Sequence, residues 1–153
     1  MDDHDRHPIN WYRKRFAALQ PVSEASAVGT YLAVFVGPWW LRVGARWSLP
    51  LSGMRGWVGK RIEGSGRAVN LVRRAGQLQD FCPMQADLGP SLMDDGQSLI
   101  FSYAGNAPGM LRFFRDELRQ YDEHRILAFA RVNLPLLNLI PLPFMLQKAA
   151  END

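Results

Sequence analysis

Short apolar segments separated by closely spaced turn signals run from Trp57 to the C-terminus, and no other feature constrains the fold of this chain as strongly. The first four segments read WVGKRIE, RAVNLVRR, DFCPMQADL and QSLIFSYAG, with turn signals at Gly64-Ser65-Gly66, Gly76 and Asp94-Asp95-Gly96. An Asp-Gly pair between alternating apolar residues is a strong hairpin signal. Because no helical segment separates these strands, neighbouring strands are expected to pair in the antiparallel sense. We therefore predict a mainly all-β fold, a small antiparallel β-barrel or strongly bent sheet with an N-terminal helix.

The C-terminal third extends the same pattern. RDELRQY and RILAFARV flank the charged segment DEH, which predicts a hairpin turn, and PFMLQK follows the proline-broken LPLLNLIPLP as a closing strand. Leu111, Phe114 and Leu118 are also spaced for a helix, so residues 109–121 allow two interpretations. We favour the strand hairpin and keep the helix as the alternative.

The N-terminal part predicts both helix and strand. HPINWYRKRFAALQ places Tyr12, Phe16 and Leu19 at helical spacing, which indicates one amphipathic helix. GTYLAVFVG is rich in β-branched and aromatic residues and predicts a strand. The following WWLRVGARWSLPLSGM is either a short helix cut at Leu49-Pro50 or an irregular crossover that places its tryptophans over a barrel mouth.

Length and composition fit one packed domain. The chain has 153 residues, of which 47% are hydrophobic and 22% charged. We expect a single domain over residues 1–153, with a helix and loop at 1–27, a barrel at 28–148 and a tail at 149–153. Cys82 is the single cysteine and the N-terminus does not resemble a signal peptide, so a cytoplasmic location fits, with peripheral membrane contact as an option. The longest apolar runs fall short of the ~18 residues of a transmembrane helix.

Basic and aromatic residues concentrate in the middle of the chain. Between Glu24 and Asp80 the single acidic residue is Glu63, and this stretch holds four of the five tryptophans. Arginine with tryptophan suits an anionic surface above an apolar layer, or an anionic ligand with an apolar body. The alternative is that the tryptophans are core residues and the cations are solvated. The cations are Arg42, Arg46, Arg55, Lys60, Arg61, Arg67, Arg73 and Arg74.

The segment GMRGWVGKRI has the composition of a phosphate-binding loop but not its spacing. Such a loop needs two glycines separated by four residues, then Lys and Ser or Thr. Gly53 and Gly59 are separated by five residues, and Lys60 is followed by Arg61. The glycines also lead into a predicted strand, whereas a phosphate loop opens a helix. A nucleotide site is therefore not expected here.

Metal-binding residues are sparse. His4 and His7 lie in the N-terminal tail and His124 lies in a predicted turn, so these imidazoles do not assemble a metal or haem site. Cys82 has no evident His partner, and we interpret it as a small apolar core residue. We expect no metal, no cofactor and no catalytic residues.

The segment RDELR carries charged residues on both faces of a predicted strand. Arg115, Glu117 and Arg119 share one face, while Asp116 and Leu118 share the other. If the first face points into the barrel, Glu117 and Arg119 form a buried cluster able to orient a ligand carboxylate or phosphate. If it points outward, it is a surface ladder that contributes little.

Trp57, Lys60 and Asn70 carry further expectations. If Trp57 packs in a core or pocket, its replacement by alanine should cost about 3–5 kcal/mol. We expect Lys60 to lie on the other face of its strand and to contribute little to stability. Asn70 lies in the otherwise apolar AVNLV, where a lone amide needs a partner, and a structural hydrogen bond is favoured over a ligand contact.

Two parts of the chain resemble a known family. GTYLAVFVGPWWL followed by LSGMRGWVGKRI is similar to the small bacterial domain named for its GXWXG motif, although Tyr31 stands where that motif has tryptophan. RFFRDELRQYDEHRILAFARV and PFMLQK resemble the partner domain of unknown function that usually follows it. The resemblance implies a small β-rich barrel with a role toward a lipid or another hydrophobic ligand, and no established catalysis.

We therefore expect a non-catalytic binding module for an amphipathic or anionic hydrophobic ligand such as a lipid. The acyl or ring portion is expected against the tryptophans and the leucine-rich C-terminal segment, and the anionic head near the cations. The residues expected to bind it are Trp39, Trp40, Trp57, Lys60, Arg61, Asn70, Glu117 and Arg119.

Two other functions stay open as alternatives. One is peripheral binding of nucleic acid through the basic central stretch, although these tryptophans cluster beside proline and leucine rather than along a strand. The other is an enzyme acting on a small hydrophobic substrate inside the barrel. Such an enzyme needs an acid–base pair from Glu117, Asp116 or Tyr103, and the sequence places none of them opposite another.

Overall fold

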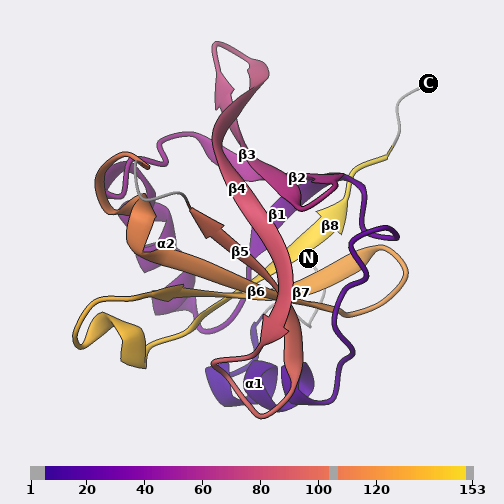
Figure 1. Cartoon of the computed structure of the whole chain (residues 1–153). Helices are drawn as coiled ribbons and strands as arrows, with labels where there is room; N and C mark the ends of the chain where they lie inside the picture. The colour runs from indigo at the N-terminus through magenta and orange to yellow at the C-terminus, as the bar shows by residue number, and fades with distance from the viewer. Residues whose placement is uncertain (1–5, 104–106, 151–153) are drawn as a thin grey trace.

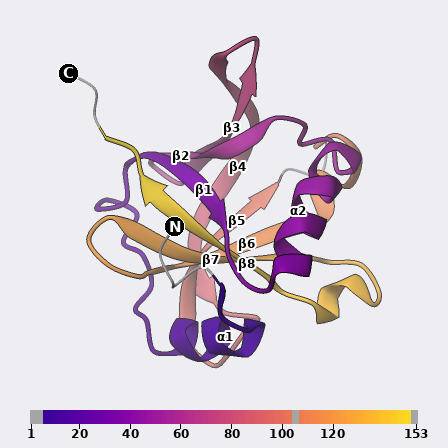
Figure 2. The same cartoon turned by 180° about the vertical axis from the view of Figure 1, so that it is seen from behind.

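The computed structural model describes residues 6–103 and 107–150, in which each strand pairs antiparallel with its sequence neighbours and β8 closes a barrel against β1 (Figure 1, Figure 2). The strands are β1 (Gly29–Phe35), β2 (Trp57–Gly64), β3 (Arg67–Arg74), β4 (Gln77–Pro90), β5 (Gln97–Tyr103), β6 (Phe114–Gln120), β7 (Arg125–Val132) and β8 (Leu142–Lys148). The helices are α1 (Ile9–Ala17) and α2 (Trp39–Leu51), with short 3-10 helices η2 (Gly109–Phe113) and η3 (Leu137–Leu139). The prediction of a mainly-β barrel with an N-terminal helix is confirmed. His4, the end of the predicted strand QSLIFSYAG and residues 151–153 of the predicted tail lie outside the described residues.

Tight two-residue turns join the first hairpins. β2 is linked to β3 through Ser65-Gly66, and β3 to β4 through Ala75-Gly76, with φ of 56° and 76° in the first turn and 50° and 77° in the second. Two successive residues in the left-handed region are the mark of a type I′ turn, whose twist matches that of the flanking strands. The turn glycines identified in the sequence therefore set the pairing of these strands.

Residues 109–121 form one 3-10 turn followed by a strand, so the predicted hairpin of β6 and β7 is confirmed. Leu111 is buried in η2, and from Phe114 onward the chain alternates with period two. Phe114, Asp116 and Leu118 face the interior, where Phe114 and Asp116 line a pocket and Leu118 joins the barrel core. The helical spacing in this segment is therefore incidental.

One end of the barrel interior is filled by apolar side chains. Val22 and Ala27, from the segment between α1 and β1, pack into this end together with inward residues of all eight strands. The cluster also contains Tyr31, Ile62, Ala68, Met84, Ala86, Leu99, Phe101, Leu118, Ile126, Ala128, Ala130, Phe144 and Leu146.

Helix α1 covers part of the outer wall (Figure 1). Tyr12 and Phe16 are fully buried against Leu127, Phe129 and Met145, which point outward from β7 and β8. The rings of Phe16 and Phe129 pack edge to face with centroids 5.2 Å apart. The amphipathic N-terminal helix predicted from the spacing of Tyr12 and Phe16 is present.

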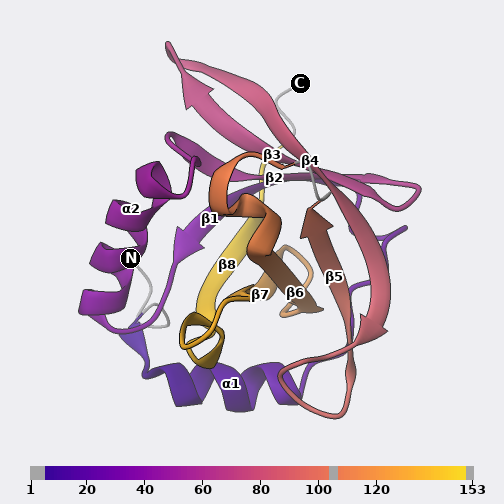
Figure 3. The same ribbon diagram turned by 60° about the vertical axis from the view of Figure 1, so that its left-hand side comes forward.

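Helix α2 lies beside the barrel (Figure 3), where it lines a pocket together with residues of the strands. The segment is thus the helix of the two predicted alternatives, and Pro50 occupies its last turn, where it ends the helix near the expected place. Within the part of the chain that the structure describes, no helix combines the length and apolar character needed to cross a membrane.

A β-bulge in β2 decides which of its side chains enter the barrel. Trp57 pairs with Val72 and Gly59 with Leu71, so β2 has one residue more than β3 at this point. An extra residue inverts the alternation of faces on one side of the bulge. Trp57 and Lys60 therefore both face the interior and line one pocket, although they are three positions apart. The expectation that they occupy different faces is wrong for this reason.

The bulge brings β2 against β1 so closely that only glycine fits at position 59. A Cβ added to Gly59 would lie 2.0 Å from the carbonyl oxygen of Tyr31 and 3.0 Å from Cα of Leu32. Both contacts are with backbone atoms, which cannot rotate away. The close approach of the two strands thus explains why glycine occupies the third position of the W-x-G-K segment.

We predict that Gly59→Ala lowers the free energy of unfolding by about 3 kcal/mol, the upper part of the usual range for overpacking, because the methyl group would overlap the Tyr31 carbonyl. Gly44→Ala, inside α2, is the matched control. Nothing lies within 4 Å of its added Cβ, and alanine in a helix is favoured over glycine by about 1 kcal/mol. Urea unfolding of both variants measures the difference. Equal stability of the two would contradict the close approach of β1 to β2.

Candidate ligand-binding site

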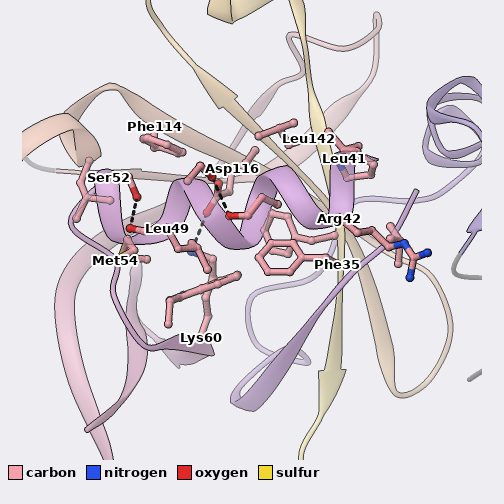
Figure 4. Close-up of a pocket in the computed structure, with 18 of the residues that line it drawn as sticks. Phe35, Leu41, Arg42, Leu49, Ser52, Met54, Lys60, Phe114, Asp116 and Leu142 are labelled. Atoms are coloured by element: carbon pink, nitrogen blue, oxygen red, sulfur yellow. Dashed lines mark hydrogen bonds and ion pairs between the residues drawn. The ribbon is translucent and has the colours of Figure 1, made fainter. Parts of the chain in front are cut away.

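A largely apolar pocket lies between α2 and the barrel interior (Figure 4). The helix contributes Leu41, Ala45 and Leu49, which share one face because they are spaced four residues apart. The cavity volume is about 70 Å³, and the hollow around it measures about 660 Å³ when the part open to solvent is counted. The main apolar residues of the barrel wall are Phe35, Trp57, Phe114, Ala130, Leu142 and Phe144.

A buried ion pair crosses the barrel interior at the inner side of this pocket. Nζ of Lys60 lies 2.8 Å from Oδ2 of Asp116, and the two side chains are 2% and 5% exposed. Lys60 is on β2 and Asp116 on β6, strands that are not neighbours in the barrel. The pair therefore reaches from one wall to another through the interior.

Asn70 connects this pair to two further polar groups. Its Oδ1 accepts hydrogen bonds from Nζ of Lys60 at 2.8 Å and from the indole nitrogen of Trp57 at 3.1 Å. Its Nδ2 donates to the hydroxyl oxygen of Tyr103 at 2.6 Å. Lys60, Asn70, Tyr103 and Asp116 are called the polar cluster below.

The electrostatics of the cluster keep Lys60 charged. Burial alone would lower the pKa of Lys60, but the charge of Asp116, the Tyr103 side chain and the hydrogen bonds outweigh it, so that this pKa is raised. Burial raises the pKa of Tyr103, and the charge of Lys60 opposes this only in part. Both shifts favour the protonated forms of the two groups, so at neutral pH the cluster holds the Lys60 ammonium group and a neutral Tyr103 phenol.

The structure brings three of the residues selected from the sequence into this site. Trp57 and Lys60 line the pocket, and Asn70 lies behind them as a hydrogen-bonding partner. The structural hydrogen bonds expected of Asn70 are present. Trp39 and Trp40 lie elsewhere, on the outer face of α2, where their side chains are exposed.

Arg61 points out of the barrel because it follows the inward Lys60 on a regular part of β2. Its guanidinium pairs with the carboxylates of Asp80 and Glu63 on the outer surface. Arg61 therefore points away from the barrel interior and does not line the pocket where the predicted ligand contact would occur.

Glu117 and Arg119 lie on the outer wall yet are buried, an outcome between the two that the sequence left open. Arg119 donates to the carbonyl oxygen of Phe16 at 2.8 Å and to both carboxylate oxygens of Asp94 at 2.7 and 2.6 Å. Glu117 accepts from the hydroxyl of Ser91 at 2.6 Å and from the amide of the next residue, also at 2.6 Å. These bonds join α1 and the β4–β5 loop to β6 on the outer wall. Glu117 and Arg119 therefore stabilise the fold and do not line the pocket.

Two residues of the polar cluster were not selected as ligand-binding from the sequence. The sequence offered Asp116 and Tyr103, with Glu117, only as candidate members of an acid–base pair, and it placed none of the three opposite another. The alternation in RDELR could have identified Asp116. Asp116 shares a strand face with Leu118, and an acid on a buried face needs a cation as its partner. Among the described residues, no group of three or more His, Cys, Asp or Glu side chains is placed to hold a metal ion.

The barrel is similar to the crystal structure of a protein from Thermomonospora curvata. The two chains share 16% sequence identity with a TM-score of 0.69, over 95% of this chain and 91% of the other. At this level of identity the likeness shows a shared fold. No family model matches the chain, and no curated protein matches it in sequence.

We predict that Lys60→Met lowers the free energy of unfolding by about 3–5 kcal/mol, because it leaves the Asp116 carboxylate buried and unpaired. The double variant Lys60→Met/Asp116→Leu should lose less than this, since no unpaired charge remains. Arg61→Met is the control, because exposed ion pairs contribute about 1 kcal/mol at most. Denaturant unfolding of the three proteins measures these differences. Additive losses in the double variant would contradict the direct pairing.

The raised pKa values predict a loss of stability in alkaline solution. A group whose pKa is higher in the folded state stabilises the fold fully below its unfolded pKa, and this contribution is lost as pH rises through the folded pKa. For Lys60 the decline should begin near pH 10.4, roughly the unperturbed lysine pKa. The decline should be smaller in Lys60→Met/Asp116→Leu. Urea midpoints of both proteins across this range check the sign, and parallel profiles would contradict it.

Proposed function

We propose that this protein is a binding module for a small amphipathic ligand, such as a lipid, held between α2 and the barrel interior. The observation that carries the proposal is the polar cluster at the inner side of an otherwise apolar pocket. Eight-stranded barrels have an interior wide enough for one small ligand. Apolar walls with a few convergent polar groups are the usual composition of such sites.

The pocket supports a ligand whose buried polar end is uncharged. The charge of Lys60 is already balanced by Asp116 at 2.8 Å, so a ligand carboxylate at this point would leave one negative charge in excess in a buried site. A hydroxyl, carbonyl or ester group can exchange hydrogen bonds with Tyr103, Lys60 and Asp116 without that penalty. The apolar body of the ligand would then lie against Leu41, Leu49 and the aromatic wall.

An anionic group on the ligand is better placed at the rim. Arg42 lines the pocket, and Figure 4 shows its guanidinium directed away from Lys60. Its Nε is buried and has no hydrogen-bond partner among the described residues. An anionic head beside Arg42 would satisfy this group while the uncharged end of the ligand reaches the polar cluster.

The proposal includes a distant relation to the GXWXG family. Its support is that each residue of the W-x-G-K segment has a distinct part in the site. Trp57 lines the pocket, Gly59 allows β1 to approach, and Lys60 forms the buried pair.

A second candidate function is proton transfer on a small apolar substrate. The observation that favours it is that Tyr103 and Asp116, which the sequence left apart, both line the pocket beside Lys60. A phenol and a carboxylate in a water-poor site are a general acid and a general base. The test is whether carbon-bound hydrogen of the bound molecule exchanges with heavy water. Exchange that Asp116→Asn abolishes would show that the protein is an enzyme and not a non-catalytic binding module.

The binding proposal predicts that the neutral fluorophore N-phenyl-1-naphthylamine binds in the pocket and that Ala45→Trp lowers its affinity about tenfold or more, because the larger side chain fills the space beneath α2. Val43→Trp is the matched control on the outer side of the same helix. Fluorescence titration measures both, with near-ultraviolet circular dichroism to verify folding. Native mass spectrometry of freshly purified protein should show a bound small molecule that is absent from Ala45→Trp. Equal probe affinity in the two variants would overturn the assignment of the pocket.

A further inference from the structure

Helix α2 is apolar on both of its faces. The face toward the barrel lines the pocket, and the opposite face exposes a row of large apolar side chains to solvent. Trp39, Trp47 and Leu51 are 71%, 76% and 86% exposed. A helix that covers a barrel normally presents polar residues to solvent, so a row of large apolar side chains on the outer face of α2 is unusual. The outer row consists of Trp39, Trp40, Val43, Trp47 and Leu51.

A second exposed apolar group lies at the same end of the barrel. The loop between β7 and β8 exposes Leu136 and Leu139 at 78% and 70%, together with Leu137 and Ile140. Figure 1 and Figure 2 show this loop on the same side of the barrel as α2, and Figure 3 shows the two separated from each other. The chain passes from this loop into Leu142 and Pro143, which line the pocket with Leu41 of the helix. The outer row of α2 and this loop are together called the mouth surface.

Three cations near the outer row belong to α2 and the turn that follows it, and Arg131 of β7 donates to the carbonyl oxygen of Asn138 in the loop. Arg42 and Arg46 lie on the helix and Arg55 in the turn, and no Asp or Glu occurs between Glu24 and Glu63. Lys60 and Arg61, the next cations along the chain, are engaged by carboxylates. The charge of this region is therefore positive where the apolar side chains are exposed.

We propose that the mouth surface docks on an anionic lipid bilayer. Tryptophan prefers the interfacial layer of a bilayer, leucine and isoleucine the acyl boundary below it, and arginine the lipid phosphates above it. The mouth surface supplies tryptophan, leucine and isoleucine, and Arg42 and Arg46 of α2 flank its apolar row, which is the arrangement of an interfacial helix. The chain needs no spanning helix for this mode of binding.

Two other occupants fit the same surface less well. A second copy of the chain would bring Arg42 and Arg46 of both molecules together around an apolar contact, where like charges oppose association. A nucleic acid would find tryptophans to stack on, but the exposed Leu51, Leu136 and Leu139 would meet a charged phosphate backbone. The bilayer is the occupant that satisfies both the aliphatic and the cationic groups.

Docking would bring the mouth of the pocket to the membrane surface. The same helix has one face in the docked layer and the other against the pocket, so an amphipathic lipid would reach Arg42 before it reaches the polar cluster. This step rests on the proposed function, whereas docking itself does not require that the pocket binds a ligand.

The test is co-flotation of the full chain with phosphatidylcholine vesicles that contain or lack phosphatidylglycerol. We expect binding to the anionic vesicles, a blue shift of tryptophan emission on binding, and weaker binding at high salt. Trp39→Ser/Trp47→Ser should lower the vesicle affinity about tenfold or more without loss of stability, because both side chains are exposed. Leu88→Ser is the matched control, an exposed apolar residue on β4 away from the mouth surface, and it should bind as the parent protein does.

The Ala45→Trp variant separates this proposal from the proposed function. This variant should still bind anionic vesicles although it no longer binds the fluorophore. Membrane binding and pocket binding can therefore fail independently of each other. Absence of vesicle binding overturns docking. So does firm binding to single-stranded DNA without vesicle binding, or a dimer in solution that Trp39→Ser/Trp47→Ser dissociates. Equal affinity for vesicles with and without phosphatidylglycerol overturns the role given to the arginines.

Discussion

The ion pair between Lys60 and Asp116 organises the interior of this barrel. It joins β2 to β6 through the interior and divides each of these strands into two parts. On one side of the ion pair, Ile62 and Leu118 belong to the apolar core. On the other side, toward α2, Trp57 and its neighbours line the pocket. Burying two charges is unfavourable unless each is paired and hydrogen-bonded, which is why Asn70 and Tyr103 converge on the same point. The position of the pocket follows from that of the pair.

Much of the fold could be predicted because its signals are local. The type I′ turns depend on adjacent residues such as Ser65-Gly66, and a sheet whose strands pair in sequence order needs little beyond turn positions and alternation. The burial of Tyr12 and Phe16 was likewise readable from helical spacing. Closure of the barrel was the one non-local step, and closure removes the exposed edges that an open sheet would present.

The site was harder to predict because its residues meet across the barrel. Nothing in the sequence near Lys60 points to Asp116, which lies on the fourth strand along from β2. The bulge between Trp57 and Gly59 added a second obstacle, because a strict period of two separates Trp57 from Lys60. Alternation alone therefore gave the wrong face for Lys60. The glycine at position 59 is the one local sign of the bulge, because a side chain there would overlap the backbone of β1.

The uneven distribution of cations and tryptophans in the central stretch has more than one physical origin. Lys60 and Arg61 are neutralised by carboxylates from distant strands, and Trp57 is a pocket residue, so these contribute nothing to a charged or aromatic surface. The exposed tryptophans of this stretch all lie on α2, whereas its exposed arginines lie on α2, in the turn after it and on β3. Both sides of α2 are apolar, for different reasons. The inner side of α2 must be apolar because it lines the pocket. The outer side has no such requirement within the described fold. The proposed docking on a lipid bilayer would supply one, because tryptophan prefers the interfacial layer.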